Sequence, residues 1–207
     1  MSRRLFLKRA AKAGAATIAL PALVPGSALG LDGAVAPSNR IVFAGIGLGG
    51  RGSHDLGWLL TNPEVQMVAI CDVKKQKREQ HKNTIDKHHK SQDCKTYIEM
   101  MDVLTRPDID AILTATSDRL HATVSIRAMR NGKDVYTEKP ASMFIAEGQA
   151  VVETARQYGR VYQAGMQRLS EANFIVCNEL LRLGRLGEVK TVYAHLAPWG
   201  NVNMSRD

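Results

Sequence analysis

The sequence is poor in aromatic residues and cysteines, and it has no long apolar run. Aromatic residues make up 5% of the 207 residues, so it offers little for nucleic-acid stacking platforms. Its three cysteines include no C-x-x-C pair, which indicates neither a disulfide scaffold nor a zinc knuckle. His88 and His89 are adjacent and point to different sides of a helix, so no metal site is predicted. No run of about 18 apolar residues is present, which excludes a bundle of membrane-spanning helices.

The remaining composition is that of a folded protein. Apolar residues make up 44% of the chain and charged residues 23%, which are ordinary values for a globular protein. Disorder is therefore excluded as the dominant state. The length suffices for one domain and part of another.

The first 36 residues resemble an export signal more than a folded element. A basic segment, Ser2–Lys8, precedes the apolar stretch Ala13–Val24, and small residues follow, in the order of a secretory signal. Ser2–Lys8 itself resembles the twin-arginine motif, a receptor-read address. The alternative is a basic amphipathic helix on a membrane surface. The sequence predicts a twin-arginine signal over residues 1–36, cleaved after Ala28 or Ala36, with the export machinery as partner and a periplasmic or otherwise exported location.

The net charge of +8 raises the question of a nucleic-acid partner. The predicted signal contains five basic residues and one acidic residue, so without it the net charge falls by four. The other basic residues are scattered, apart from a cluster over residues 74–90 that has neither interleaved aromatics nor a nucleic-acid motif. Such a cluster is typical of the solvated face of a helix. We therefore predict no nucleic-acid partner.

From residue 39 onward, short apolar runs alternate with helix-like segments. Strands are expected over residues 41–46, 65–70, 95–97, 110–114, 134–137 and 160–164. Helices are expected from the first glycine cluster to residue 60, over 74–90, through 104, and over 120–130 and 145–158. Six strands separated by helices predict an α/β domain with a doubly wound, mostly parallel sheet over residues 39–165.

A glycine-rich loop directly follows the first expected strand. Gly47, Gly49 and Gly52 fit the pattern G-x-G-x-x-G, and Gly45, Gly47 and Gly50 fit it in a second register. The first register is preferred because Ile46 then ends the strand. In this Rossmann-type pattern the glycines permit a tight turn, close approach of a diphosphate, and close packing of helix on strand. A helix N-terminus then faces the phosphates. The candidate cofactor-binding residues of this loop are Gly47, Gly49, Gly50, Arg51 and Gly52.

An acidic residue ends the second expected strand, as a dinucleotide site requires. Asp72 lies at about the expected spacing from the glycine motif. A carboxylate there accepts hydrogen bonds from ribose hydroxyls and repels a 2′-phosphate, which favours NAD over NADP. Lys74, Lys75 and Lys77 would soften that repulsion. The alternative for Asp72 is a helix N-cap or a plain loop acid. Nothing later supplies a flavin-type second motif, which disfavours FAD.

Three further motifs follow in a fixed order. Residues 134–140, ending in Glu138-Lys139-Pro140, resemble the E-K-P segment of the Gfo/Idh/MocA oxidoreductases, which include glucose–fructose oxidoreductase and inositol dehydrogenase. Residues 110–122 resemble that family's A-T-P-x-x-x-H segment, with Ser117 where the family usually has proline. Residues 163–168 resemble its G-x-x-x-R stretch. The resemblance runs from about residue 39 to about residue 196.

The resemblance implies roles for the matching residues. In this family the Glu138–Pro140 segment faces the nicotinamide and the sugar, and a cis peptide bond commonly precedes the proline. Lys139 would hydrogen-bond the reacting hydroxyl and relay its proton while hydride leaves for the ring, and Glu138 would orient it or touch the cofactor's ribose. For His121 capping or packing is an alternative role, and for Arg168 a salt bridge. The further cofactor-binding residues implied are Thr116, Ser117, His121, Glu138, Lys139, Gln167 and Arg168.

Residues 166–207 are expected to begin a second, α+β domain. A helix is expected over residues 173–183 and a strand over 188–196, where the family's substrate-binding sheet begins. Residues 197–207 do not match the family's D-x-x-x-H segment, so a truncated product is predicted.

The resemblance implies a function for the whole protein. It would be an exported NAD-dependent oxidoreductase that transfers hydride from a sugar or cyclitol hydroxyl to tightly bound NAD. The alternatives are a non-catalytic or partner-dependent NAD-binding fragment, and a redox-neutral NAD-dependent glycosidase. A full-length chain would associate as a homo-oligomer through its second sheet.

Overall fold

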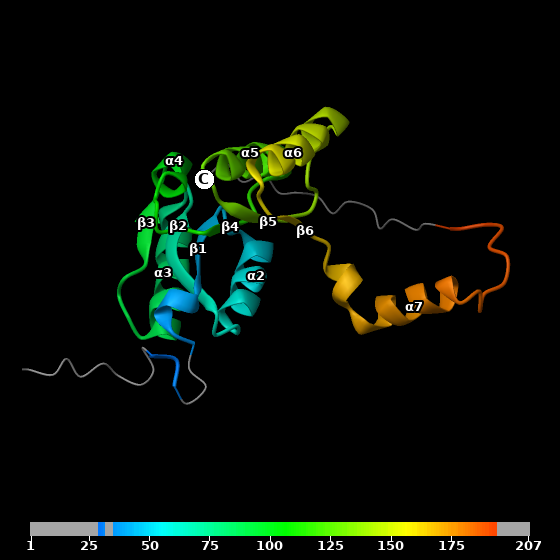
Figure 1. Cartoon of the computed structure of the whole chain (residues 1–207), viewed down its shortest axis with the longest axis horizontal. Helices are drawn as coiled ribbons and strands as arrows, with labels where there is room; N and C mark the ends of the chain where they lie inside the picture. The colour runs from blue at the N-terminus through cyan, green and yellow to red at the C-terminus, as the bar shows by residue number, and fades with distance from the viewer. Residues whose placement is uncertain (1–28, 32–34, 194–207) are drawn as a thin grey trace, which may run out of the picture. The chain divides into compact units, whose positions relative to one another are not determined.

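The computed structural model describes residues 29–31 and 35–193 and is shown in Figure 1. The predicted signal lies almost wholly outside the described residues. The chain divides into two units, Met1–Gly165 and Met166–Asp207, and each is described by itself. Within the described ranges, no helix combines the length and the apolarity needed to cross a bilayer.

Six parallel strands form the sheet of the first unit, in the order β3-β2-β1-β4-β5-β6 (Figure 1). The strands are β1 (Ile41–Ile46), β2 (Val65–Cys71), β3 (Lys95–Tyr97), β4 (Ala111–Thr114), β5 (Asp134–Glu138) and β6 (Tyr162–Gly165). The strand order reverses between β1 and β4, so the crevice beyond their carboxyl ends is where such sheets bind ligands. The predicted fold class is therefore correct.

Helices cover both faces of this sheet (Figure 1). They are α2 (Gly50–Leu60), α3 (Lys75–His89), α4 (Met100–Leu104), α5 (His121–Arg130) and α6 (Ile145–Tyr158), with short 3-10 helices η2 (Pro37–Asn39) and η3 (Asp118–Leu120). Ile112 belongs to the apolar cluster with α4, α5 and α6, whereas its neighbour Leu113 belongs to the cluster with α2 and α3. Successive strand residues face opposite sides, so β4 is buried on both faces, and this explains its continuous apolar sequence.

The second unit contains η4 (Gln167–Ser170) and α7 (Ala172–Arg182). Within the described range, α7 buries none of its residues, and the free cysteine on it, Cys177, is exposed. The strand expected over residues 188–196 is wrong for residues 188–193, which form no strand, and 194–196 lie outside the described residues. The alternating sequence is a local property, whereas a strand is stabilised by pairing with another strand.

Candidate functional site

The turn after β1 requires glycine at position 47. Gly47 has a φ of +65°, in the left-handed region that favours glycine. A Cβ atom there would lie 2.3 Å from Cγ2 of Thr116 and 3.0 Å from its Cα. The Gly47 N–H donates to the carbonyl oxygen of Cys71 at 2.8 Å, which ties the turn to the end of β2. The chain can therefore turn here only without a side chain.

The next two motif glycines shape the start of α2. A Cβ atom at Gly52 would lie 2.8 Å from Cβ of Ala115, so this glycine lets the helix pack closely on the segment after β4. A Cβ atom at Gly49 would meet no atom within 4 Å, which leaves its backbone open to a ligand. Gly49 caps α2 without a side-chain hydrogen bond, and the first turn of this helix has no acidic residue. The first N–H groups of such a helix lack intrahelical partners and attract an anion.

A cavity of about 600 Å³ lies at the carboxyl ends of the central strands. That volume is in the range of small-molecule and cofactor sites. The predicted site residues that line it are Gly47, Gly49, Asp72, Thr116 and Ser117. The structure thus brings together the glycine loop, the acid after β2 and the segment after β4. The other candidates of the glycine motif do not line this cavity: Gly50, Arg51 and Gly52 lie in the first turn of α2.

Asp72 is half-buried at the rim of this cavity. Its Oδ1 atom accepts a hydrogen bond from the Lys74 N–H at 2.8 Å within the loop before α3. The N-cap of α3 is Lys74, without a side-chain hydrogen bond, so Asp72 does not cap this helix and the loop-acid alternative fits it better. Of the three lysines expected to soften repulsion of a 2′-phosphate, Lys74 and Lys77 line the same cavity as Asp72, and Lys75 does not. Accepting this hydrogen bond and lining the cavity are compatible, because one carboxylate has two oxygens.

The two residues with proposed catalytic roles differ in burial. Glu138 ends β5 with 3% of its surface exposed, and its Oε2 atom accepts the Lys139 N–H at 3.3 Å. Lys139 is exposed, and the peptide bond between Lys139 and Pro140 is cis, as the resemblance implied. The structure therefore offers the Lys139 side chain to solvent at the carboxyl end of the sheet while Glu138 faces inward.

Arg51 binds two buried carboxylates. Its Nη2 atom lies 2.9 Å from Oδ1 of Asp55, and its Nε atom lies 3.3 Å from Oε1 of Glu138. The guanidinium also lies 4.9 Å from the ring centre of Trp58. Asp55 is 3% exposed and was missed by the sequence analysis. The available signal was its position four residues after Arg51 on one helix.

The carboxyl group of Asp55 is shifted toward its protonated form. Burial, followed by the negative charge of Glu138, raises its pKa from 3.8 to about 6, although Arg51 acts in the opposite direction. Because the folded protein disfavours the charged form, this group stabilises the fold most at low pH. Its contribution falls as the pH rises from about 4 to about 6 and stays low above that range.

We expect Asp55→Asn to remove this pH dependence. A shift of about two pKa units corresponds to about 3 kcal/mol at most, so the difference in unfolding free energy between wild type and variant should change by about 1–3 kcal/mol between pH 4 and 7. Denaturant unfolding across this pH range measures it. The matched control is Asp93→Asn, at an exposed acid, which should leave the wild-type profile unchanged. A variant profile parallel to that of the wild type would contradict the assignment.

His121 lies buried behind the cavity wall, with 2% of its surface exposed. Its Nδ1 atom lies 2.7 Å from the carbonyl oxygen of Pro140, and its Nε2 atom lies 3.2 Å from that of Thr116. The imidazole therefore bridges the segment after β4 and the segment that carries Lys139. This placement agrees with the packing alternative, and cofactor contact by His121 stays a prediction.

Gln167 and Arg168 belong to the second unit. The Nη1 atom of Arg168 lies 2.7 Å from Oε2 of Glu171, and its guanidinium lies 5.1 Å from the ring centre of Phe174. The contact with Glu171 is a salt bridge, the alternative to cofactor binding that the sequence left open for Arg168. Cofactor contacts by these two residues stay predictions.

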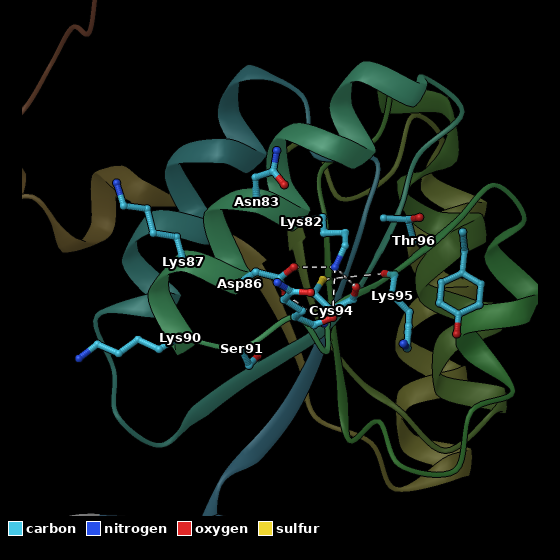
Figure 2. A pocket seen from close by; sticks show the side chains of 11 residues that line it. Lys82, Asn83, Asp86, Lys87, Lys90, Ser91, Cys94, Lys95 and Thr96 are labelled. Atoms are coloured by element: carbon cyan, nitrogen blue, oxygen red, sulfur yellow. Dashed lines mark hydrogen bonds and ion pairs between the residues drawn. The ribbon is translucent and has the colours of Figure 1, made fainter.

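A larger hollow, of about 1090 Å³, lies beside α3 and β3 (Figure 2). The Nζ atom of Lys82 donates to the carbonyl oxygen of Cys94 at 2.8 Å and pairs with Asp86. Lys87 and Lys90 extend away from this cluster (Figure 2). None of the motif residues lines this hollow. We therefore do not assign it to the candidate site, although it is the larger of the two cavities. Within the described part of the chain, no group of three or more His, Cys, Asp or Glu side chains is placed to hold a metal ion.

Comparison with known proteins agrees with this geometry. Residues 40–166 match the model of the Gfo/Idh/MocA family, described as an oxidoreductase family with an NAD-binding Rossmann fold. This match confirms NAD as the cofactor predicted from the sequence. The region matched contains the glycine loop, Asp72 and the Glu138–Pro140 segment.

Individual relatives match at low identity. The scyllo-inositol 2-dehydrogenase (NAD(+)) of Bacillus subtilis is 27% identical over 72% of this chain and 42% of its own length. A glycosyl hydrolase family 109 protein of Shewanella baltica is 28% identical over 95% of this chain and 47% of its own length. The solved scyllo-inositol dehydrogenase of Lactobacillus casei, with bound NAD(H) and scyllo-inositol, shares the fold with a TM-score of 0.64 at 20% identity, covering 72% of this chain and 43% of that one. The chain thus spans less than half the length of these relatives.

Proposed function

The chain belongs to the Gfo/Idh/MocA oxidoreductase family, and on that premise we propose that the whole protein oxidises a hydroxyl group of a sugar or cyclitol with NAD. The observation that carries the proposal is that one cavity is lined by Gly47, Gly49 and Asp72. Gly47 follows β1, and only β4 separates β1 from β5, the strand that ends at Glu138. The curated relatives named as inositol dehydrogenases support the substrate class. Export by the twin-arginine pathway belongs to the same proposal and rests on the sequence of residues 1–36.

The residues of this chain would divide the work between binding and proton transfer. The N–H groups at the start of α2 would bind the diphosphate, and Asp72 would accept hydrogen bonds from the ribose hydroxyls. Bound NAD supplies the hydride acceptor. The Lys139 amine would hydrogen-bond the substrate hydroxyl and hold its proton at Nζ. Substrate selection would belong to the part of the protein outside the first unit.

A second candidate is a redox-neutral glycosidase that uses NAD transiently. It is favoured by the family 109 relative, whose match extends over 95% of this chain, compared with 72% for the inositol dehydrogenases. Both candidates require bound NAD. They differ in outcome, because the oxidoreductase accumulates NADH during turnover and the glycosidase releases a sugar without net reduction of NAD.

The first test of the proposal is nucleotide binding by the purified chain. Mass spectrometry of the protein as isolated, followed by calorimetric titration with NAD and NADP, should detect retained NAD or specific binding of NAD. Turnover of a panel of inositols, sugars and aryl glycosides by the whole protein, followed by NADH absorbance and by release of the aryl group, then separates the two candidates. Absence of NAD binding would reject both.

We expect Asp72→Ser to reduce the preference for NAD over NADP. The variant loses the carboxylate that binds the ribose and repels a 2′-phosphate, while Lys74 and Lys77 remain beside the cavity. The Kd for NAD should rise about tenfold, since a hydrogen bond to a charged group contributes about 1.5 kcal/mol, and the Kd for NADP should fall. Titration of both nucleotides measures the change. Asp93→Ser, outside the cavity, is the control, and an unchanged NAD/NADP ratio in Asp72→Ser would contradict the assigned role.

A further inference from the structure

Arg51, Asp55 and Glu138 form a buried group that we call the Arg51 cluster. Arg51 is the second residue of α2, directly after Gly49 and Gly50, and its guanidinium contacts Asp55 at 2.9 Å and Glu138 at 3.3 Å. Glu138 in turn accepts the N–H of Lys139. The cluster therefore forms a continuous path from the glycine loop to the backbone of the proposed catalytic lysine.

The Glu138 carboxylate is confined from a second side. A Cβ atom at Gly165 of β6 would lie 2.8 Å from Oε1 of Glu138 and 2.9 Å from the hydroxyl oxygen of Tyr136. The absence of a side chain at Gly165 thus leaves just enough room for the carboxylate beside Arg51. A shift of Glu138 would move the acceptor of the Lys139 N–H.

The charges in the cluster are unbalanced when both carboxyl groups ionise. The charged or titratable groups facing Asp55 are Arg51 from its own helix and Glu138 and Tyr136 from β5. One guanidinium then faces two buried carboxylates, and an uncompensated buried charge is strongly disfavoured. The cation that faces Asp55 is the Arg51 guanidinium, 2.9 Å from its Oδ1 atom, and Asp55 shares this cation with Glu138. Asp55 therefore takes up a proton more readily than an exposed aspartate.

We propose that Asp55 is a positioning residue that directs Arg51 onto Glu138 and thereby ties the glycine loop to the Lys139 segment, with the tie strengthened when Asp55 is protonated. A neutral Asp55 leaves the full charge of the guanidinium to Glu138, whereas an ionised Asp55 competes for it. The proposal deepens the proposed function and rests on it, since it concerns the same NAD site.

The experiment measures NAD affinity and backbone protection in the same proteins. Calorimetric titrations from pH 5 to pH 8 should show NAD affinity falling about fivefold as Asp55 ionises, an effect of the size usual for coupled sites. In Asp55→Asn, which mimics the protonated form, the affinity should stay at its low-pH value throughout. In Arg51→Met the affinity should be low and independent of pH.

Amide hydrogen exchange supplies a readout that does not depend on NAD. Exchange at the Lys139 N–H should quicken about tenfold in Arg51→Met, because its acceptor loses the guanidinium that holds it. The Lys133 N–H donates to the carbonyl oxygen of Ala128 directly before β5. Its exchange should be unaffected and so reports that the variant is folded. Arg51→Lys keeps the positive charge but loses the planar guanidinium, whose separate N–H groups face both carboxylates. Exchange at the Lys139 N–H should therefore be intermediate in this variant.

The outcomes separate the inference from the proposed function. A wild-type pH profile in Asp55→Asn, or unchanged Lys139 exchange in both Arg51 variants, would overturn the inference while leaving NAD binding intact. Failure of the wild-type chain to bind NAD at any pH would reject the proposed function, and quickened Lys139 exchange in Arg51→Met would still support the tie between Arg51 and the Lys139 segment.

Discussion

Turnover by the whole protein should fall about 10²- to 10⁴-fold when Lys139 is replaced by methionine, the range typical for loss of a proton-transfer group. Methionine keeps much of the length of the side chain and removes the amine that would hold the proton of the substrate hydroxyl. NAD affinity should change less than about threefold, because Lys139 does not line the cavity beside the glycine loop. Steady-state kinetics and NAD titration of the same preparation measure the two effects.

The control for this variant is an exposed lysine away from the candidate site. Lys87 lies on α3 beside the hollow of Figure 2, and Lys87→Met should leave turnover and NAD affinity unchanged. If Lys139→Met retained wild-type turnover, the proposed role of Lys139 would be rejected, even with NAD bound. A loss of NAD binding in this variant would instead assign Lys139 to cofactor binding.

Gly47→Ala should weaken NAD binding by at least about 100-fold, which corresponds to about 2.8 kcal/mol. A residue with a Cβ atom is disfavoured at a φ of +65°, and the new atom would lie 3.0 Å from the Cα atom of Thr116, which cannot move without its backbone. Relief of the clash would displace either the turn or the wall of the cavity. The unfolding free energy should also fall by about 1–3 kcal/mol.

Gly57→Ala is the matched control for this variant. Gly57 lies within α2, is exposed, and has no atom within 4 Å of the position its Cβ would take. Alanine should stabilise this helix by about 0.5–1 kcal/mol and leave the Kd for NAD unchanged. Calorimetric titration and denaturant unfolding of the two variants side by side measure both quantities. Equal NAD affinity in Gly47→Ala and the wild type would contradict the assignment of the turn to diphosphate binding.

The strands and helices of the first unit could be predicted because each has a local signature. Strands buried on both faces are continuous apolar runs, as β4 shows, and Asn131-Gly132 marks the end of α5. The predicted ends of β1, β3 and α6 coincide with the observed ones, and the other predicted ends differ by at most two residues. For example, β6 begins at Tyr162 rather than at residue 160.

The Arg51 cluster could not be predicted, because its contacts are long-range. Arg51 and Glu138 are 87 positions apart, and nothing near either residue indicates the other. The glycine motif placed Arg51 among the cofactor-binding candidates, whereas the structure directs its side chain to two buried acids. The strand expected over residues 188–196 failed for a related reason, since alternation is visible in one segment but a strand depends on its partners.

The strand order has a consequence for how the protein is made. β1 is synthesised first, yet it lies between β2 and β4, and Thr116, which closes the turn at Gly47, follows β4. A nascent chain on the ribosome therefore lacks one wall of the nucleotide crevice until that later segment has emerged and docked. Dinucleotide capture thus comes late in biogenesis, and by mass action it selectively stabilises molecules whose central sheet is already assembled.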